Sequence, residues 1–385
     1  MPLKKIKVGI IQPFINTVGG VEEVIACQVE NLPEFEWTLY GLSFDEALIA
    51  RHYPSLAALK KNQALNLTAI RLPSRFQRRE ILDLLEVISF SFLGLGKKFD
   101  REDILIAHYP FATLLSLFTK KPVIWYCHCL KRYLYEAEIQ REYEKIWGEP
   151  SLFYRLLKSA LAGLEKMAAR RMRAVLCNSE HTRRKLEKYL NINGRVIPPA
   201  IDPQNVDQVE YGNFILSPSR LVNYKRVDLA IAAMQYLPQI KLKVVGAGPE
   251  EIKLKKLVKD LALKNVEFME PQASLAELYK KCLAVIYLSK DEDYGIVPRE
   301  AMGWKKPVIA AKDGGGILEA VIDNENGFLV ELNAEEIADR IKFLAENREL
   351  AGKLGGSGYE SVRKLTWPDH AEKLKGVINE LAGLF

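Results

Sequence analysis

The strongest structural signal in this chain lies in residues 290–320, KDEDYGIVPREAMGWKKPVIAAKDGGGILEA. The stretch predicts a loop, a helix over 296–304, a short buried strand over 307–311 and a glycine loop that leads into another helix. Pro298 suits the first turn of the first helix, where a backbone N–H is not needed. Strand, glycine loop and helix in this order are typical of the carboxyl edge of a parallel sheet. We therefore expect an α/β fold with a ligand site at that edge.

Two carboxylates in this stretch, Glu292 and Glu300, are eight residues apart. Glu292 lies in the expected loop beside Tyr294 and Gly295, and Glu300 lies one or two turns inside the expected helix. Glu300 is placed to accept two ribose hydroxyls, and Glu292 to accept hydroxyls of a sugar. Glycines let backbone N–H groups approach an anion, and helix N-termini attract phosphate. The alternative is that both glutamates are solvated surface acids.

The E-x7-E spacing continues into EAMGWKKPVIA and then GGGILEAVIDNENGFLV. This ordered string resembles the retaining glycosyltransferases of family four. The resemblance implies the α/β GT-B architecture, two Rossmann-like domains whose parallel sheets face each other across a cleft. It also implies that a nucleotide diphosphate sugar binds in that cleft and that the sugar is transferred with retention of its anomeric configuration.

Length and composition agree with two globular domains: 385 residues, 48% hydrophobic and 27% charged. The apolar run near the N-terminus covers only residues 8–11, which is too short for a signal peptide. Five scattered cysteines favour a reducing, cytoplasmic compartment over a disulfide framework. Cys127-His128-Cys129 is not followed by a second ligand pair of suitable spacing, so we expect no metal site.

Charge is unevenly distributed. Residues 1–200 hold 30 basic and 21 acidic residues, whereas residues 201–385 hold 25 and 28. The basic half indicates an anionic partner. Because no nucleic-acid module is visible, the first candidates for this partner are membrane lipid and a phosphorylated acceptor. The helix expected over 151–173 has a basic stripe that can lie on an anionic bilayer at the inner face of the membrane. It can equally be an ordinary core helix with a solvated side.

The first domain begins with a strand over 7–12, and Gly19 and Gly20 open a helix that runs to about Asn31. A glycine pair between a strand and a helix suits phosphate. The resemblance places Gly19 and Gly20 near the diphosphate and the sugar. Further along, a basic loop over 71–79 leads into an amphipathic helix expected over 80–95.

Two expected strands of this domain, 104–107 and 123–127, end at His108 and His128. The segment WYCHCLKRYLYE, which contains His128 and Arg132, is similar to the YCH-x-x-x-RY signature of mannosyltransferases of this family that use GDP-mannose. The family often has Thr-Pro after the histidine, whereas this chain has Cys-Leu. The resemblance places His128 in contact with the transferring sugar, and the alternative is a structural histidine at a strand end.

The segment VIPPAID, residues 196–202, resembles the family's approach to its interdomain linker. We expect one domain over 1–205 and a nucleotide-sugar-binding domain over 206–366. The resemblance implies that the last helix, about 367–385, packs back on the first domain.

In the second domain, Arg220 and Lys225 flank the start of a helix near Val227. Two cations at a helix entrance suit a diphosphate, and they match the family's SRL-x-x-x-K element. GAGPE at 246–250 is not a dinucleotide fingerprint. The strand that ends at Met269 precedes the loop where the family lodges its base.

The resemblance therefore assigns the following roles. Contact with the sugar and the reacting diphosphate falls to His128, Glu292, Arg220 and Lys225. The donor-binding residues are Gly19, Gly20, Arg220, Lys225, Met269, Tyr294, Gly295, Ile296 and Glu300. Fixed charges stabilise the leaving diphosphate, so neither a metal nor another cofactor is expected. The expected reaction moves a hexose, with mannose from GDP-mannose as the first candidate, to a glycan or lipid-linked glycan in polysaccharide biosynthesis.

Rival interpretations stay open at this point. Asp291-Glu292-Asp293 fits the D-x-D pattern of metal-dependent glycosyltransferases, which binding in EDTA would test. UDP-linked sugars are alternative donors. A nucleotide-sugar epimerase or a non-catalytic nucleotide-sugar-binding protein can share the fold. A pyridoxal-dependent phosphorylase would need a lysine motif that is not found.

Overall fold

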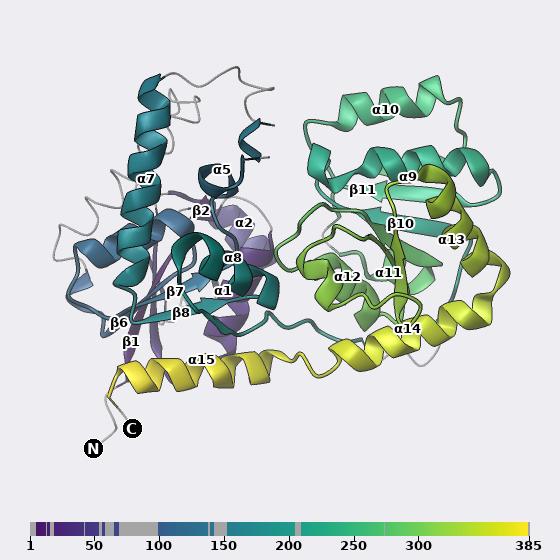
Figure 1. Cartoon of the computed structure of the whole chain (residues 1–385). Coiled ribbons are helices and arrows are strands. Elements are labelled where there is room, and N and C mark those ends of the chain that lie inside the picture. Colours follow the sequence, from purple (N-terminus) through teal and green to yellow (C-terminus); the bar gives the residue numbers. More distant parts are fainter. Residues whose placement is uncertain are drawn as a thin grey trace. The chain divides into compact units, whose positions relative to one another are not determined.

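The structure, a computed structural model, describes residues 5–12, 14–15, 19–41, 43–53, 56–57, 65–68, 99–137, 139–141, 152–204, 209–272 and 274–383. The chain divides into two compact units (Figure 1). Unit 1 comprises residues 1–199 and 367–385, and unit 2 comprises residues 200–366. The basic loop expected over 71–79 and the helix expected over 80–95 lie outside the described residues.

The described part of unit 1 contains a parallel sheet with the strand order β5-β3-β1-β6-β7-β8-β9. Its central strand β6 and the neighbouring strand β7 are apolar and completely buried, as expected for a parallel sheet covered on both faces. The strands are β1 (Lys7–Ile11), β3 (Glu36–Tyr40), β5 (Leu65–Thr68), β6 (Ile104–Ala107), β7 (Val123–Cys127), β8 (Ala174–Cys177) and β9 (Arg195–Val196), with a small separate pair β2 (Phe14–Ile15) and β4 (Ser43–Phe44).

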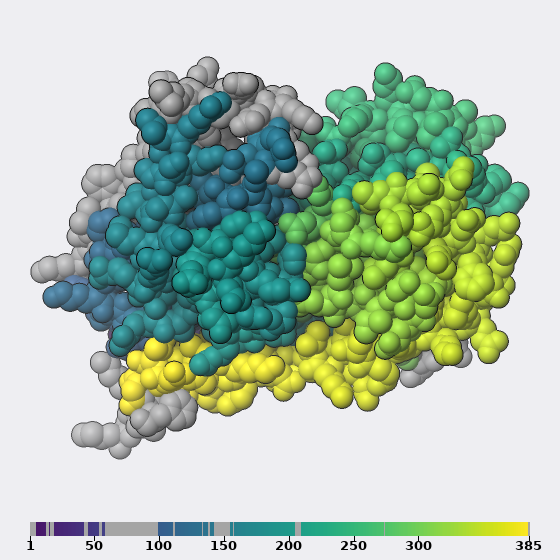
Figure 2. All heavy atoms as spheres, in the orientation of Figure 1, coloured from purple at the N-terminus to yellow at the C-terminus, as the bar shows by residue number. Residues whose placement is uncertain are grey.

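Helices connect these strands and include the C-terminal helix. They are α1 (Gly20–Asn31), α2 (Glu46–His52), the 3-10 helix η2 (Pro110–Leu117), α5 (Arg132–Tyr135), α7 (Leu152–Arg170), α8 (Glu180–Leu190) and α15 (Trp367–Leu381). α15 packs on α1, where the side chains of Gln28 and His370 are joined by a 3.0 Å hydrogen bond. Figure 2 shows the residues of α15, in yellow, as part of the surface of unit 1.

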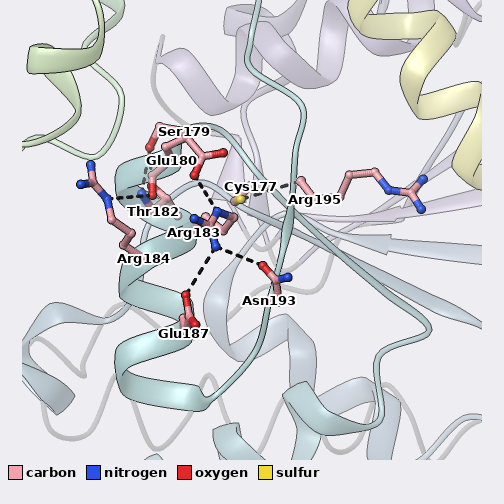
Figure 3. A network of polar contacts seen from close by, with 9 residues as sticks. All are labelled: Cys177, Ser179, Glu180, Thr182, Arg183, Arg184, Glu187, Asn193 and Arg195. Carbon is pink, nitrogen blue, oxygen red and sulfur yellow. Dashed lines mark hydrogen bonds and ion pairs between the residues drawn. The ribbon is translucent and has the colours of Figure 1, made fainter.

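A polar network holds the start of α8 and the loop that follows it (Figure 3). The Ser179 hydroxyl accepts from the Thr182 N–H at 2.9 Å, so Ser179 is the N-cap of α8. Arg183 then donates to Glu180, to Glu187 and, at 3.2 Å, to Asn193 beyond the helix. The network therefore fixes the connection between α8 and β9.

α7 has a mixed surface. Leu161 and Ala168 are buried in the core, whereas Leu156 and Met167 are 64% and 49% exposed. Among the residues that the structure describes, no helix combines the length and apolarity needed to cross a bilayer.

Unit 2 contains a second parallel sheet with the strand order β12-β11-β10-β13-β14-β15 in the described residues. Its strands are β10 (Phe214–Pro218), β11 (Lys241–Val245), β12 (Val266–Met269), β13 (Ala284–Tyr287), β14 (Val308–Ala311) and β15 (Gly327–Val330). Its helices are α9 (Val227–Ala233), α10 (Glu251–Asp260), α11 (Ala276–Lys281), α12 (Ile296–Gly303), α13 (Ala334–Glu346) and α14 (Arg348–Val362), with 3-10 turns η3 (Asn223–Lys225), η4 (Met234–Tyr236) and η5 (Gly316–Glu319).

The start of unit 2 lies between Pro199 and Ala200, slightly before the boundary expected from the proline-rich segment. Ile201 explains the difference, because its side chain is 5% exposed and belongs to the apolar core of unit 2. Its N–H also donates to the Leu365 carbonyl at 3.2 Å. The packing of this apolar side chain, rather than the nearby prolines, therefore sets the position of the boundary.

One local prediction was wrong. The helix expected after the glycine loop is only the 3-10 turn η5, which ends at Glu319. It does not continue as a helix, because the Ile322 N–H donates to the Asn326 side chain at 2.8 Å instead of to a helical carbonyl. At the start of the turn, the Gly316 N–H donates to the Glu292 carbonyl at 2.6 Å. The glycine segment therefore serves to support the loop that carries Glu292.

Candidate active site at the carboxyl edge of the second sheet

The strand order of unit 2 reverses between β10 and β13. Strands β11 and β12 extend the sheet on one side, and β14 and β15 extend it on the other. In open parallel sheets, ligands bind outside the carboxyl ends of the strands at such a reversal. Arg220 and Lys225 follow β10, and Glu292 follows β13, so the sheet topology brings these predicted residues to one place.

Backbone hydrogen bonds join the loops at this edge. The Lys290 N–H donates to the Tyr224 carbonyl at 2.9 Å, which ties the loop after β13 to the loop after β10. The Asp291 N–H donates to the Asp313 carbonyl at 2.9 Å. Arg226 donates two hydrogen bonds of 2.6 Å each to the Asp313 carboxylate. The loops that follow β10, β13 and β14 are therefore joined to one another.

Two glycines allow the close approach of these loops. Gly315 has a φ of +65°, and a Cβ there would lie 2.7 Å from the Glu292 carbonyl oxygen. Gly246 has a φ of +146°, and a Cβ there would lie 2.0 Å from the Ser219 carbonyl oxygen. A side chain at either position would displace the loop that carries Glu292 or the one that carries Arg220.

Lys225 and Glu292 form an ion pair at this edge. The Lys225 ammonium donates to the Glu292 carboxylate and to the Tyr287 hydroxyl. The same Glu292 oxygen accepts from Ser289 at 2.7 Å and from Tyr287 at 3.2 Å. The side chain of Lys225 is 7% exposed and that of Glu292 is 24% exposed, so the carboxylate keeps an open side.

Burial and pairing shift the pKa of both groups. Burial alone would raise the pKa of Glu292, but Lys225 and the hydroxyls of Ser289 and Tyr287 lower it below its usual value. Burial lowers the pKa of Lys225, and the charge of Glu292 partly offsets that effect. The lowered pKa of Glu292 keeps this carboxylate charged at neutral pH, which strengthens the hydrogen bonds that it accepts.

Arg220 lies in an exposed position next to this pair. One of its terminal nitrogens donates to the Tyr224 hydroxyl at 2.9 Å, which holds the guanidinium on its own loop. An exposed arginine beside a buried lysine presents fixed positive charge to an anion such as a diphosphate.

Glu300 lies on α12 and is half-buried. The Tyr279 hydroxyl donates to one of its carboxylate oxygens at 2.9 Å. Burial, followed by the Glu300 charge, raises the pKa of Tyr279 well above its usual value, so the hydroxyl stays protonated and able to donate. The hydrogen bond orients the Glu300 carboxylate, as the predicted ribose contact would require.

The remaining predicted residues of unit 2 surround the start of α12 and the end of β12. Gly295, with a φ of +78°, is the N-cap of α12, and Ile296 is its first residue. The first N–H groups of a helix have no partner within the helix and attract anions. Tyr294 is only 4% exposed, with the Arg299 guanidinium 3.8 Å from its ring centroid. Met269 ends β12, is half-buried and packs against the apolar core.

In unit 1, His108 and His128 are neighbours at the carboxyl edge of the sheet. Nδ1 of His108 lies 3.0 Å from Nε2 of His128, and the two rings stack 5.3 Å apart. The His128 carbonyl accepts from Asn178 at 2.8 Å. Burial lowers the pKa of His128 to about 3, which makes it a neutral ring that can exchange one hydrogen bond with a hydroxyl.

The C-terminal helix contributes a third histidine to this cluster. His370 is 3% exposed, and its Nδ1 lies 2.8 Å from the Pro198 carbonyl, so this nitrogen must carry the proton. Its ring lies 5.8 Å from that of Tyr126, which in turn lies 4.7 Å from His128. Burial lowers the pKa of His370 to about 4.

Gly19 is the N-cap of α1, and Gly20 is the first residue of that helix. A Cβ at Gly19 would lie 2.7 Å from a carboxylate oxygen of Glu22. Glu22 is 8% exposed, and burial raises its pKa. An acid this close to Gly19 favours a hydroxyl donor over a phosphate at this point of the loop.

Inspection of the sequence missed the hydroxyl groups that support the carboxylates. Tyr287 and Ser289 contact Glu292, and Tyr279 contacts Glu300. Tyr287 and Ser289 could have been found, because polar side chains at the end of an apolar strand face the ligand edge. Nothing local marks Tyr279, which approaches Glu300 from a separate helix.

The fold of this chain is shared with a solved structure. A crystal structure of the Anabaena protein HepE in complex with UDP and glucose superposes with a TM-score of 0.73, over 97% of this chain and 99% of that one, at 17% identity. This likeness, together with the two parallel sheets of this chain, confirms the expected GT-B fold.

Two family models match successive parts of the chain. "Glycosyltransferase Family 4" matches residues 18–205, and "Glycosyl transferases group 1" matches residues 201–361. Taken with the fold, the two matches show that the chain belongs to the GT-B glycosyltransferases.

Curated relatives are glycosyltransferases too. An uncharacterized glycosyltransferase of Methanocaldococcus jannaschii is 28% identical over 59% of this chain, and the alignment covers 66% of that protein, just under two thirds. The alpha-1,3/1,6-mannosyltransferase ALG2 of Dictyostelium discoideum is 25% identical over 79% of this chain and 80% of its own length.

Proposed function

We propose that this protein is a retaining hexosyltransferase that uses a nucleotide diphosphate sugar. The observation that carries the proposal is the pair of Lys225 and Glu292 at the reversal point of the second sheet, with Arg220 on the loop after β10 and Glu300 on α12. Cations for a diphosphate and carboxylates for sugar and ribose hydroxyls are the groups that such a donor needs.

Each group has a role in the proposed reaction. Glu300 holds the ribose, and Glu292 holds hydroxyls of the sugar. Arg220, Lys225 and the N–H groups of Gly295 and Ile296 neutralise the diphosphate as the glycosidic bond breaks. Electrostatic stabilisation of this kind acts on the leaving group and needs no protein nucleophile. Retention follows from the family resemblance, with the leaving phosphate assisting the acceptor hydroxyl.

For unit 1 we propose that His128 contacts the transferring sugar. Its neutral ring, held between His108 and the Asn178 contact to its carbonyl, supports this role. Gly19 and Gly20 are proposed to approach the donor, and the nearby Glu22 favours its hydroxyls.

The first candidate donor is GDP-mannose, and the first candidate acceptor is a glycan or a lipid-linked glycan. The likeness to ALG2, named as a mannosyltransferase, and the segment around His128 support mannose. The alternative is a UDP-linked hexose, and the neighbour crystallised with UDP and glucose supports it. Met269 is proposed to lie beside the base in either case.

Calorimetric titration with GDP, UDP, ADP and their sugar conjugates, in EDTA, tests the donor and the nucleotide site together. We expect micromolar binding of GDP and about 100-fold weaker binding in Glu300→Ala, since the variant loses charged hydrogen bonds to the ribose. Glu325→Ala, an exposed acid of the same unit, is the matched control and should bind as the wild type does.

The outcomes separate the candidates. Preference for UDP would keep the chemistry and overturn the mannose assignment. Binding that appears only with Mn²⁺ would favour the D-x-D interpretation, in which Asp291 and Asp293 hold a metal. We propose metal-independent binding instead, because Arg220 and Lys225 already supply positive charge for the diphosphate.

We also propose that unit 1 touches an anionic membrane through α7. Exposed Leu156 and Met167 lie on the same helix as exposed Arg155 and Arg170, which suits an interface of apolar chains and phosphate. Co-sedimentation with phosphatidylserine vesicles at 20 mM salt, lost at 500 mM salt, is the expected result. Absence of co-sedimentation at low salt would refute the contact.

A further inference from the structure

Tyr287 is the last residue of β13, at the reversal point of the second sheet. The residue is 7% exposed, and its ring belongs to the apolar core that also contains Ala310, its register partner on β14. The ring is therefore held by the sheet, and the hydroxyl reaches the carboxyl edge, where Lys225 and Glu292 meet.

The hydroxyl contacts both members of the ion pair. It accepts from the Lys225 ammonium and lies 3.2 Å from the Glu292 oxygen that also accepts from Lys225. The Lys225 nitrogen lies 4.7 Å from the centroid of the Tyr287 ring. The three groups thus form a closed triangle.

The number of hydrogens on the Tyr287 hydroxyl and the Lys225 ammonium determines which hydrogen bonds remain available to a ligand. The Tyr287 hydroxyl has one hydrogen, which it donates to Glu292, and it accepts from Lys225 with a lone pair. Burial, followed by the charge of Glu292, raises the pKa of Tyr287 well above its usual value, so the hydroxyl keeps that hydrogen. An ammonium has three donors, and two of those on Lys225 are used inside the triangle. One N–H remains for a ligand.

We propose that Tyr287 is a positioning residue for the donor: its hydroxyl fixes the Lys225 ammonium and the Glu292 carboxylate relative to each other. The third N–H of Lys225 then points at the diphosphate while the open side of Glu292 meets the sugar. The inference rests on the proposed function, which gives Lys225 and Glu292 their ligands.

Tyr287→Phe is the test, because phenylalanine keeps the buried ring and removes only the hydroxyl. We expect kcat/KM for donor hydrolysis to fall about tenfold, the effect of one hydrogen bond to a charged group. The pKa of Glu292 should rise, since the hydrogen bond from Tyr287 helps to lower it. The acid limb of the pH profile, where the carboxylate becomes protonated, should therefore move to higher pH.

Tyr211→Phe is the matched control. Its hydroxyl donates to the Lys305 carbonyl at 2.9 Å, in the same unit but away from Lys225 and Glu292. This variant loses one hydroxyl and one hydrogen bond, as Tyr287→Phe does, and should leave both kcat/KM and the acid limb unchanged.

A readout without activity separates the two proposals. The Glu292 carboxyl signal, assigned with Glu292→Gln in ¹³C-glutamate-labelled protein, gives its pKa directly by NMR titration. If the wild type binds no nucleotide sugar, the proposed function fails, and the positioning role toward a donor fails with it, whatever the titration shows. If the wild type is active and Tyr287→Phe shows an unchanged kcat/KM, acid limb and Glu292 titration, the inference alone is overturned.

Discussion

Lys225→Met is expected to lower kcat/KM for the nucleotide-sugar donor by about 10²- to 10³-fold, the usual effect of removing one preorganised group from a developing negative charge. Lys225 is buried, and its ammonium is held by Glu292 and Tyr287, so it needs no reorganisation when the diphosphate leaves. Release of nucleoside diphosphate by donor hydrolysis, followed without an acceptor, is the measurement.

The same change should destabilise unit 2. Removing one partner of a buried ion pair leaves an uncompensated charge, which typically costs about 3–5 kcal/mol. We expect about 2–3 kcal/mol here, because Glu292 is 24% exposed and keeps its bonds from Ser289 and Tyr287. Urea unfolding followed by the fluorescence of Trp304 is suitable, since it is the one tryptophan of the sequence within unit 2.

A double variant separates stability from chemistry. Lys225→Met with Glu292→Gln removes both charges, so it should recover most of the lost stability and none of the lost activity. Lys243→Met is the matched control: Lys243 lies 3.9 Å from Glu267 on neighbouring strands, and its loss should cost less than about 1 kcal/mol. Wild-type hydrolysis by Lys225→Met would contradict the proposed role of the lysine.

Acidification should destabilise unit 1 strongly through its buried histidines. The pKa of His370 is lowered from 6.5 to about 4 by burial, and burial also lowers the pKa of His108 well below its usual value. The unfolded chain binds a proton near pH 6.5, whereas the folded chain does not until the lower value is reached. Stability is therefore fully present above pH 6.5 and is lost as the pH falls toward 4. At pH 5 the loss for His370 alone is about 2 kcal/mol.

His370→Gln isolates this contribution. A glutamine amide can still donate to the Pro198 carbonyl but does not titrate, so the difference in unfolding free energy between pH 7.5 and pH 5 should shrink by about 2 kcal/mol. In a Trp304→Phe background the remaining tryptophans, of which Trp37, Trp125 and Trp367 are in the described residues, report on unit 1. An unchanged pH dependence would show that His370 is already protonated in the folded protein or is not buried.

Much of the fold follows from local patterns. Strands β6 and β7 begin and end at the expected residues, and β12 ends at Met269 as expected, because short apolar runs bounded by turn residues favour buried parallel strands. The η5 turn was mistaken for a longer helix because the apolar pattern does not reveal that the Ile322 N–H bonds to the Asn326 side chain. Ile201 likewise belongs to unit 2 through packing that no local composition shows.

In the candidate site, too, the sequence indicates some residues and not others. Arg220, Lys225, Glu292 and Glu300 could be selected from the sequence, since cations at a helix entrance and carboxylates after a strand have recognisable spacing. Tyr279 could not be selected in this way, because it reaches Glu300 from a separate helix across a distance that only folding closes.

The sequence by itself determined that this chain alternates strands and helices, that it does so in two successive halves, and which charged residues follow the strands. These properties are encoded within windows of ten to thirty residues, where hydrophobic periodicity and glycine placement act. Only the tertiary structure decided that Lys225 pairs with Glu292, that Tyr287 joins them, and that His108, His128 and His370 form one buried cluster. The physical reason is that these contacts join segments 20 to more than 200 residues apart, and strand order and burial, rather than local propensity, bring such segments together.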